Sequence, residues 1–182
     1  MAKVEKVINV SEIIRRRKYN ASIRHGYLSL LIRTILLAIM IWFALSQVLL
    51  LTQAQGMNMF PSIKDGDLII AYRLQKNYIK DDVVVYQTDA AREIGRIVAC
   101  ENDIVTIDDT GILMVNGTPQ TGEILFPTYA NENITYPYQV PENSVFILGD
   151  YRTESQDSRN SGAVNMDKLI GKVITLIRRR GL

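Results

Sequence analysis

Residues 104–117 read IVTIDDTGILMVNG, and this stretch indicates the class of fold. Two short apolar runs, residues 104–107 and 112–115, flank a turn segment rich in aspartate and glycine. Two β-type runs joined by such a segment predict a β-hairpin. The dipeptide Asn116-Gly117 that follows is a second signal for a tight turn. A β domain is therefore the first expectation.

Similar short runs continue on both sides of this hairpin. They are bounded by Asp, Gly and Asn residues and lie at residues 68–72, 83–86, 94–99, 145–148 and 173–177. No sustained helical period appears after Leu51, so these runs predict strands. Residues 120–139 contain Pro, Tyr and Asn without a clear period, which predicts a surface excursion. We expect a mainly β domain over residues 52–182.

An uncharged apolar run, TILLAIMIWFALSQVLLL, occupies residues 34–51. Its length is near the ~20 residues that cross a bilayer as a helix. Arg33 can snorkel at one end, and Trp42 is the one indole in the segment. A cleaved signal peptide has an apolar region of only ~7–15 residues, so we prefer an uncleaved anchor. A buried core helix is rejected because so small a domain could not enclose it. We expect one N-terminal transmembrane helix over residues 34–51.

The residues before this run are mostly basic. Only Glu5 and Glu12 oppose eight positive charges, on Lys3, Lys6, Arg15, Arg16, Arg17, Lys18, Arg24 and Arg33. The positive-inside rule then places residues 1–33 in the cytoplasm and residues 52–182 outside a single-pass cell membrane protein. Residues 4–27 form either a basic amphipathic helix on the inner leaflet or a disordered tail, and both alternatives stay open.

The overall composition excludes several kinds of site. A net charge of +2 gives no reason to expect a nucleic-acid partner. Cys100 is the only cysteine, so it forms no internal disulfide, and we interpret it as a small core hydrophobe. His25 is the only histidine and precedes the anchor, so the sequence predicts no metal site and no cofactor.

Several motifs resemble those of the type I signal peptidases. Residues 56–63, GMNMFPSI, resemble the family's nucleophile loop Gly-x-Ser-Met-x-Pro-Thr-Leu, and residues 149–159, GDYRTESQDSR, match Gly-Asp-Asn-Arg-x-x-Ser-x-Asp-Ser-Arg at nearly every defined position. Residues 93–103, EIGRIVACEND, resemble Lys-Arg-Ile-Val-Gly-x-Pro-Gly-Asp, and residues 113–117 resemble the Ile-x-Val-Asn-Gly hairpin. The resemblance implies a signal-peptidase-type coiled β-sheet domain behind one transmembrane helix.

The resemblance also locates the catalytic pair, and both members are replaced. The position of the family's nucleophilic serine is Asn58, and the position of its lysine is Gly95. An amide nitrogen is a poor nucleophile because its lone pair is delocalised, and glycine offers no base. Ser62 with Lys64 or Lys80 is the nearest substitute pair, but nothing in the sequence places them together. Catalysis is therefore expected to be lost.

The remaining matches imply a site without its catalytic pair. Gly56 matches a residue of the oxyanion region and Ser155 the hydroxyl that orients the lysine. The charged matches are interpreted as structural pairs behind the site: Arg96, Asp150, Asp157 and Arg159. The loop residues are candidates for contact with a peptide or the membrane, or for simple packing: Gly56, Met57, Asn58, Met59 and Phe60.

Some members of this family in Gram-positive bacteria lack both the serine and the lysine and are needed for pilus polymerisation. This chain resembles that group in its short length and its two replaced positions. The resemblance implies an inactive accessory protein or chaperone that presents pilin subunits, and possibly contacts the pilus sortase, at the membrane. The alternatives are an active type I signal peptidase with an unusual dyad, and an anchored structural protein whose basic tail recruits a cytoplasmic partner.

Overall fold

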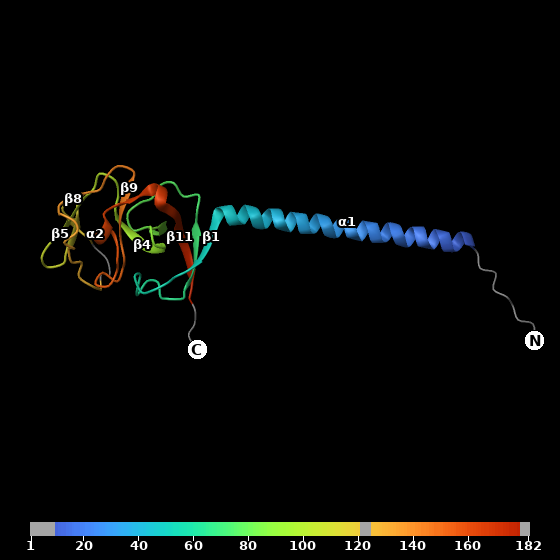
Figure 1. Ribbon diagram of the computed structural model, residues 1–182, viewed down its shortest axis with the longest axis horizontal. Helices are drawn as coiled ribbons and strands as arrows, with labels where there is room; N and C mark the ends of the chain where they lie inside the picture. Colours follow the sequence, from blue (N-terminus) through green and yellow to red (C-terminus); the bar gives the residue numbers. More distant parts are fainter. Residues whose placement is uncertain (1–9, 121–124, 179–182) are drawn as a thin grey trace, which may run out of the picture. The chain divides into compact units, whose positions relative to one another are not determined.

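The computed structural model describes residues 10–120 and 125–178 (Figure 1). The chain divides into two compact units, residues 1–46 and 47–182. The described residues of the first unit are helical, and the second unit contains every strand of the described residues.

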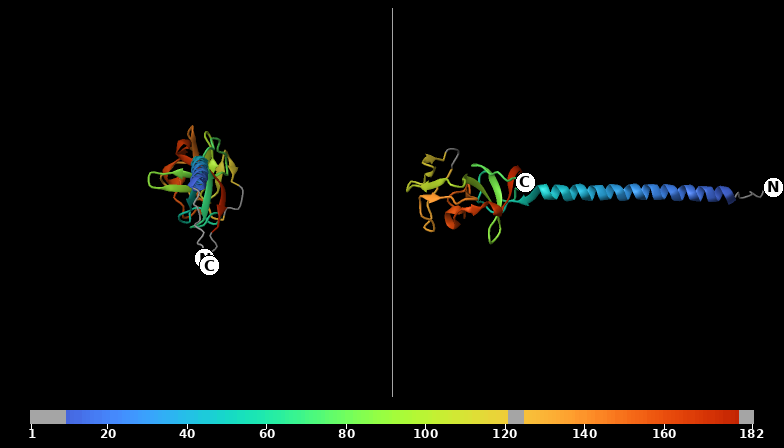
Figure 2. Two further views of the ribbon diagram at one scale, coloured as in Figure 1. Left: turned by 90° about the vertical axis from the view of Figure 1, so that its right-hand side faces the viewer. Right: turned by 90° about the horizontal axis from the view of Figure 1, so that it is seen from above.

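Helix α1 runs without interruption over Val10–Val48 (Figure 2). Its part Ile23–Val48 has a mean hydropathy of 2.3 and none of it is buried, so by length and composition it could cross a membrane. The expected N-terminal apolar helix is thus confirmed. The described part of residues 4–27, from Val10 on, is helical, whereas residues 4–9 lie outside the described residues.

The helix ends earlier than the apolar run. Residues 49–51 were expected to complete the transmembrane helix, but they lie in strand β1, Leu49–Gln53, which pairs with β2. These residues form a strand because β2 is available as a pairing partner, with Leu50 opposite Ala71 and Leu51 opposite Ile70. An apolar run is equally compatible with a helix and with a strand, and here its end is taken by the sheet.

The larger sheet of the second unit has seven antiparallel strands in the order β1-β2-β11-β3-β4-β9-β10. Its other strands are β2 Leu68–Tyr72, β11 Leu169–Ile177, β3 Val83–Gln87, β4 Arg92–Ala99, β9 Ser144–Leu148 and β10 Val164–Asn165. The last strand along the chain, β11, lies between β2 and β3, with register shifts against both.

A second sheet has four strands in the order β7-β6-β5-β8. They are β7 Thr118–Pro119, β6 Leu113–Val115, β5 Ile104–Ile107 and β8 Tyr138–Gln139. The predicted hairpin is confirmed, with Val105 opposite Val115 and Ile107 opposite Leu113. Asn116 and Gly117 both have positive φ, which the tight turn into β7 requires. The predicted mainly β fold is confirmed.

Three apolar clusters fill the domain. One lies between the two sheets around Val105 and Phe146, and a second lies under β3, β4 and β9 around Val84 and Ile147. The third packs the loop after β1 onto β2; it consists of Ala54, Met59, Ile63 and Ile69. The second and third clusters carry the residues described next. Cys100 is half-buried against the second cluster, as its interpretation as a small hydrophobe predicts.

Candidate functional site

The loop between β1 and β2 holds Asn58 in a fixed turn. Gly56 has a φ of 77° and its N–H donates to Asp65 Oδ1 at 2.8 Å, while the N–H of Phe60 donates to the carbonyl of Met57 at 2.9 Å. Met59 and Ile63 then enter the core on the far side of this turn. Asn58 itself is half-buried. These hydrogen bonds and the buried side chains on either side fix the backbone at residue 58.

Gly149, the residue after β9, joins this loop to Ser155. The N–H of Tyr151 donates to the carbonyl oxygen of Asn58 at 3.0 Å. A Cβ on Gly149 would lie 2.5 Å from that oxygen and 2.4 Å from the Cβ of Ser155. Such distances leave no space for any side chain, so this contact of three segments requires glycine.

The strand register brings residue 95 to the same place. Arg96 pairs with Leu148 and Ile97 with Ile147, so the next pair in this antiparallel ladder sets Gly95 opposite Gly149. Cross-strand pairs share one face of a sheet. The positions of the expected nucleophile, base and orienting hydroxyl, residues 58, 95 and 155, therefore meet around Gly149.

The space beside Gly95 is closed. A Cβ at this position would lie 2.4 Å from Ile147 Cγ2 and 3.4 Å from Tyr86 Cε1. Ile147 is fully buried in the second apolar cluster and has little freedom to move. A lysine at residue 95 would require that cluster to rearrange.

A carboxylate takes part in the site instead. Glu93 lies two residues before Gly95 on β4, hence on the same face, and pairs across the ladder with Tyr86. The side-chain amide of Asn58 donates to Glu93 Oε2 at 3.2 Å. Burial raises the pKa of Tyr86, and the charges of Glu93 and Asp157 raise it further. This face therefore carries negative charge.

The first charge pair of the expected shell is Arg96 with Asp150. Arg96 Nε and Nη2 donate to the two oxygens of Asp150 at 2.9 and 2.8 Å. Burial alone would raise the pKa of Asp150, but hydrogen bonds from Arg96 and Ser62 and the nearby positive charges hold it below its ordinary value. Ser62 thus supports Asp150, and no described contact links it to Lys64 as a substitute dyad would need.

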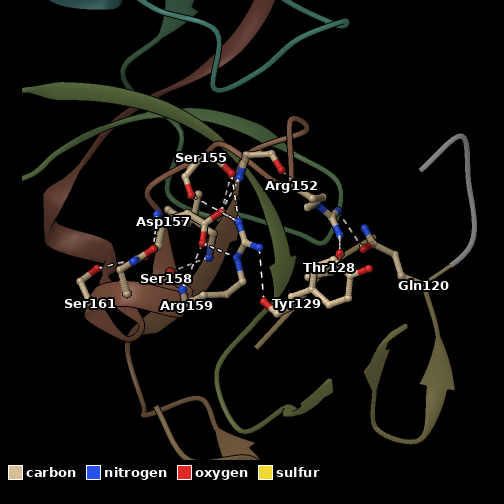
Figure 3. A network of polar contacts seen from close by, with 12 residues as sticks. Gln120, Thr128, Tyr129, Arg152, Ser155, Asp157, Ser158, Arg159 and Ser161 are labelled. Atoms are coloured by element: carbon tan, nitrogen blue, oxygen red, sulfur yellow. Dashed lines mark hydrogen bonds and ion pairs between the residues drawn. The ribbon is translucent and has the colours of Figure 1, made fainter. Parts of the chain in front are cut away.

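The second part of the shell is a network around Asp157, shown in Figure 3. Asp157 accepts from Arg159 Nε and Nη2 at 2.9 and 2.8 Å and from the Ser155 hydroxyl at 2.9 Å. It also accepts from the N–H of Gly149 at 3.1 Å and caps the short helix α2, Ser158–Ser161. Both charged side chains are almost fully buried. Ser155, without a lysine, is bonded to Asp157 and Arg159.

The sequence interpretation missed three residues of the site, namely Glu93, Gly149 and Arg152. Arg152 is buried and donates to the carbonyl of Gly149 at 3.0 Å, to Thr128 Oγ1 at 2.5 Å and to Gln120 Oε1 at 2.9 Å (Figure 3). Burial lowers its pKa to about 10. Its place within the motif of residues 149–159 was the available signal, whereas nothing local distinguished Glu93.

The loop candidates divide into exposed and buried residues. Met57 is 44% exposed, and Phe60 is half-buried with its ring 6.0 Å from that of Tyr151. Met59 is 3% exposed and packs in the core, which agrees with the packing alternative for this residue. The periodicity of a loop does not show which side chain turns inward. Met59 also lines a small hollow beside Asn58, together with Ala54, Gln55, Gly56, Ile63, Glu93 and Ile94.

Among residues 10–120 and 125–178, no group of three or more His, Cys, Asp or Glu side chains is arranged to hold a metal ion.

Comparisons with known proteins agree with these motifs. The model of the family described as signal peptidase, peptidase S26, matches residues 26–177. The probable thylakoidal processing peptidase 2, chloroplastic, of Arabidopsis thaliana is 34% identical over 133 residues, and signal peptidase I T of Bacillus subtilis is 26% identical over 177 residues. The solved signal peptidase I of Enterococcus faecalis is 26% identical with a TM-score of 0.44, covering 55% of this chain and 98% of that one.

The coverage differs between these relatives. The match takes in 64% of this chain but only 35% of the Arabidopsis thaliana protein. For the Bacillus subtilis protein it takes in 88% of both chains. This chain thus spans about a third of the first relative and most of the second.

Proposed function

Because the chain belongs to the signal peptidase, peptidase S26, family, we propose that it is a membrane-anchored, catalytically inactive member that binds pilin subunits and assists their polymerisation at the cell surface. One observation carries the loss of catalysis. Asn58 and Gly95 occupy the two dyad positions, in a site whose other parts are assembled around Gly149.

The geometry around both positions supports this proposal. Serine chemistry needs a nucleophile and a base within hydrogen-bond reach, at ~2.6–3.2 Å. Asn58 offers an amide, which is engaged with Glu93, and the space of a base at residue 95 is bounded by Ile147. Arg96, Asp150, Asp157 and Arg159 are paired with one another, so they maintain the site without supplying a nucleophile.

Peptide binding does not need the missing groups. The small hollow is bordered by the turn that holds Asn58 and by the extended backbone of Glu93 and Ile94 in β4. An extended peptide gains affinity from such backbone groups and specificity from alternate side-chain pockets. The proposed role is therefore to hold a client segment in place without cutting it.

The membrane, the pilin client and the pilus sortase as a further partner enter the proposal from different observations. The apolar helix Ile23–Val48 supports membrane anchoring, and the basic residues before it support a cytoplasmic N-terminus and an extracytoplasmic domain. Pilin and sortase rest on the resemblance to family members that lack the dyad. No nucleic-acid partner is proposed.

An immunoblot of pilin in cells deleted for the gene tests the proposal. We expect mature pilin monomers, free of their signal peptide, without the high-molecular-weight ladder of the polymer. Complementation with the wild-type gene should restore the ladder. Precursor pilin that keeps its signal peptide would instead show that the chain is a peptidase.

An active signal peptidase is the second candidate, and one observation favours it. The Ser155–Asp157–Arg159 network and the Arg96–Asp150 pair are complete, and the relatives named above are peptidases. Purified full-length protein in detergent micelles, incubated with a secretory precursor, distinguishes the two. We expect no cleavage, and cleavage abolished by Asn58→Ala would establish an unusual dyad.

The same scaffold argument predicts a gain of function. Asn58→Ser with Gly95→Lys restores the dyad, and Ile147→Leu removes the Cγ2 atom that blocks residue 95 at nearly constant volume. We expect the triple variant to cut the precursor and the double variant to cut it more slowly or not at all. A folded triple variant that binds the precursor but never cuts it would weaken the view that the rest of the site is intact.

A further inference from the structure

Glu93 borders two hollows and has an unmatched charge. It lines the small hollow beside Asn58 and also a cavity of about 570 Å³ between the end of the β3–β4 hairpin and the segment from α2 to β10. The side chain is half-buried. In the part of the chain that the structure describes, its one hydrogen-bond partner is the neutral amide of Asn58.

The other charges of the larger cavity are matched. Lys168 Nζ lies 3.3 Å from Asp89 Oδ1, and Asp157 forms its pair with Arg159 at 2.8 Å. The cavity lining contains Asp89, Glu93, Asp157 and Lys168 as its charged side chains. Asp157 is paired with Arg159 and Asp89 with Lys168, so Glu93 is the lining carboxylate that forms no ion pair among the described residues. A half-buried carboxylate in that position attracts a positively charged hydrogen-bond donor.

The position of Glu93 on β4 indicates the source of that positively charged donor. Glu93 is on the face of β4 that carries Gly95, where the family has a lysine. In this chain residue 95 is glycine and has no side chain, and Ile147 occupies the space that a side chain at this position would need. The face has therefore lost its own ammonium group but has a carboxylate two residues away. A bound molecule is the remaining source of positive charge.

The cavity fits a peptide side chain. Its volume lies within the ~300–1,000 Å³ of ordinary ligand pockets, whereas the hollow beside Asn58 is much smaller, at about 10 Å³. Beyond the charged groups the larger cavity is lined mainly by uncharged polar side chains: Gln87, Thr88, Gln156, Ser158, Asn160, Ser161 and Asn165. These groups suit an extended backbone and a long side chain with a polar end.

We propose that Glu93 binds a primary ammonium group of the client peptide, so that the client supplies the positive charge that residue 95 lacks. This inference rests on the peptide binding proposed above and adds a specificity-determining residue to it. Asn58 positions the carboxylate through its amide, and the larger cavity receives the chain that carries the ammonium group. The ammonium belongs either to a lysine side chain or to the amino terminus of the client.

Peptide binding to the full-length protein in detergent micelles tests the inference. The probe is Val-Thr-Ala-X-Ala-Thr-Val with a fluorophore on its C-terminal amide, and fluorescence anisotropy reports its affinity. Three forms are compared: N-acetylated with X lysine, N-acetylated with X norleucine, and the norleucine peptide with a free amino terminus. Norleucine preserves the apolar stem of lysine and removes only the charge. We expect at least tenfold weaker binding of the acetylated norleucine peptide than of the acetylated lysine peptide.

The free-amine form distinguishes the two sources of the ammonium group. If the norleucine peptide with a free amino terminus binds more tightly than its acetylated form, the site binds the amino terminus of the client. If only the acetylated lysine peptide binds tightly, the site binds a lysine side chain. Both outcomes support a primary ammonium at Glu93.

Glu93→Gln tests the assignment to this residue, since it retains shape and hydrogen bonding but removes the charge. We expect Glu93→Gln to lower the affinity for the acetylated lysine peptide about tenfold and to leave the affinity for the acetylated norleucine peptide unchanged. Glu154→Gln is the matched control, because Glu154 is exposed and lines neither hollow. It should change neither affinity by more than about twofold, and circular dichroism verifies that both variants are folded.

Two results would overturn the inference, and they differ in what else they overturn. Equal binding of all three peptides to wild-type protein, the free-amine form included, would reject the role of Glu93 and leave the proposed peptide binding in place. Failure of every peptide to bind, together with a normal pilus ladder in the deleted cells, would reject the proposed function as well.

Discussion

The Ser155–Asp157–Arg159 network and the face formed by Asn58, Glu93 and Gly95 meet at Gly149, yet they differ in how their charges are matched. In the network each charged group has a buried partner of opposite sign. On the face, the one hydrogen-bond partner of the Glu93 side chain among the described residues is the amide of Asn58. The network joins β9, α2 and the loop between them, whereas a nucleophile and a base are not needed to hold these segments together. A family member can therefore lose its reactive groups and retain its fold, because different residues support the two properties.

The largest expected effect comes from breaking the network. Asp157→Ala leaves the Arg159 guanidinium buried without its carboxylate and removes the cap of α2, which should lower the free energy of unfolding by about 3–5 kcal/mol. Chemical denaturation of the full-length protein in micelles, followed by circular dichroism of the β domain, measures the loss. Asp157→Asn, which retains part of the cap, should cost less. A loss below about 1 kcal/mol would mean that the network does not support the fold.

Filling the face should cost less than breaking the network. Gly95→Ala places a Cβ against Ile147 Cγ2, and overpacking of this kind costs about 1–3 kcal/mol. Ile147→Leu should relieve most of that cost, which a double-mutant cycle would record as a coupling between the two substitutions. Strictly additive effects would show that residue 95 has more room than the contact distances indicate.

The Arg96–Asp150 pair is partly exposed and should contribute less again. The pKa of Asp150 is lower in the folded protein than its ordinary value of 3.8. The ionised carboxylate therefore stabilises the fold above pH 3.8, and this stabilisation is lost as the pH falls through the lower folded-state pKa. Arg96→Ala should cost about 1–2 kcal/mol at neutral pH. The gap between wild type and variant should narrow below pH 3.8, and a gap that stays constant in denaturation curves down to pH 2 would contradict this assignment.

The smallest effect is expected at the surface. Lys168 and Asp89 lie 3.3 Å apart, but their side chains are 53% and 100% exposed. Such pairs contribute about 0–1 kcal/mol. Lys168→Ala should therefore shift the denaturation midpoint very little. A large shift would mean that the burial of a charge pair does not determine how much it contributes to the free energy of unfolding.

Local patterns in the sequence were sufficient for much of the fold. The hairpin of residues 104–115 and the apolar N-terminal helix follow from periodicity and turn residues, which act over a few positions. The end of α1 at Val48 could not be predicted, because residues 49–51 are apolar in either structure and their strand partner lies beyond the loop, in β2. The choice between contact and packing for Met59 stayed open for a similar reason, since its burial depends on Ile69 in that same strand.

The candidate site was predictable to a similar extent. Motif spacing identified Asn58, Gly95 and the charge pairs, and the structure brings them together around Gly149. The contact of Gly95 with Ile147 and the bond from Asn58 to Glu93 depend on which strands are neighbours. No local pattern singles out Ile147 or Glu93 as a neighbour of the site. Their contacts with Gly95 and Asn58 arise from packing between segments that are distant in sequence.

The position of β11 has a consequence for how the domain is made. Among the described strands β11 is synthesised last, and it lies third in the sheet, between β2 and β3. Until residue 177 has left the ribosome, the edges of β2 and β3 have no partner there, and the loop that holds Asn58 is attached to an unfinished sheet. Pairing of strands so distant in sequence is slow. During biogenesis the domain therefore exposes open strand edges, which are prone to misassociation, until its final strand inserts.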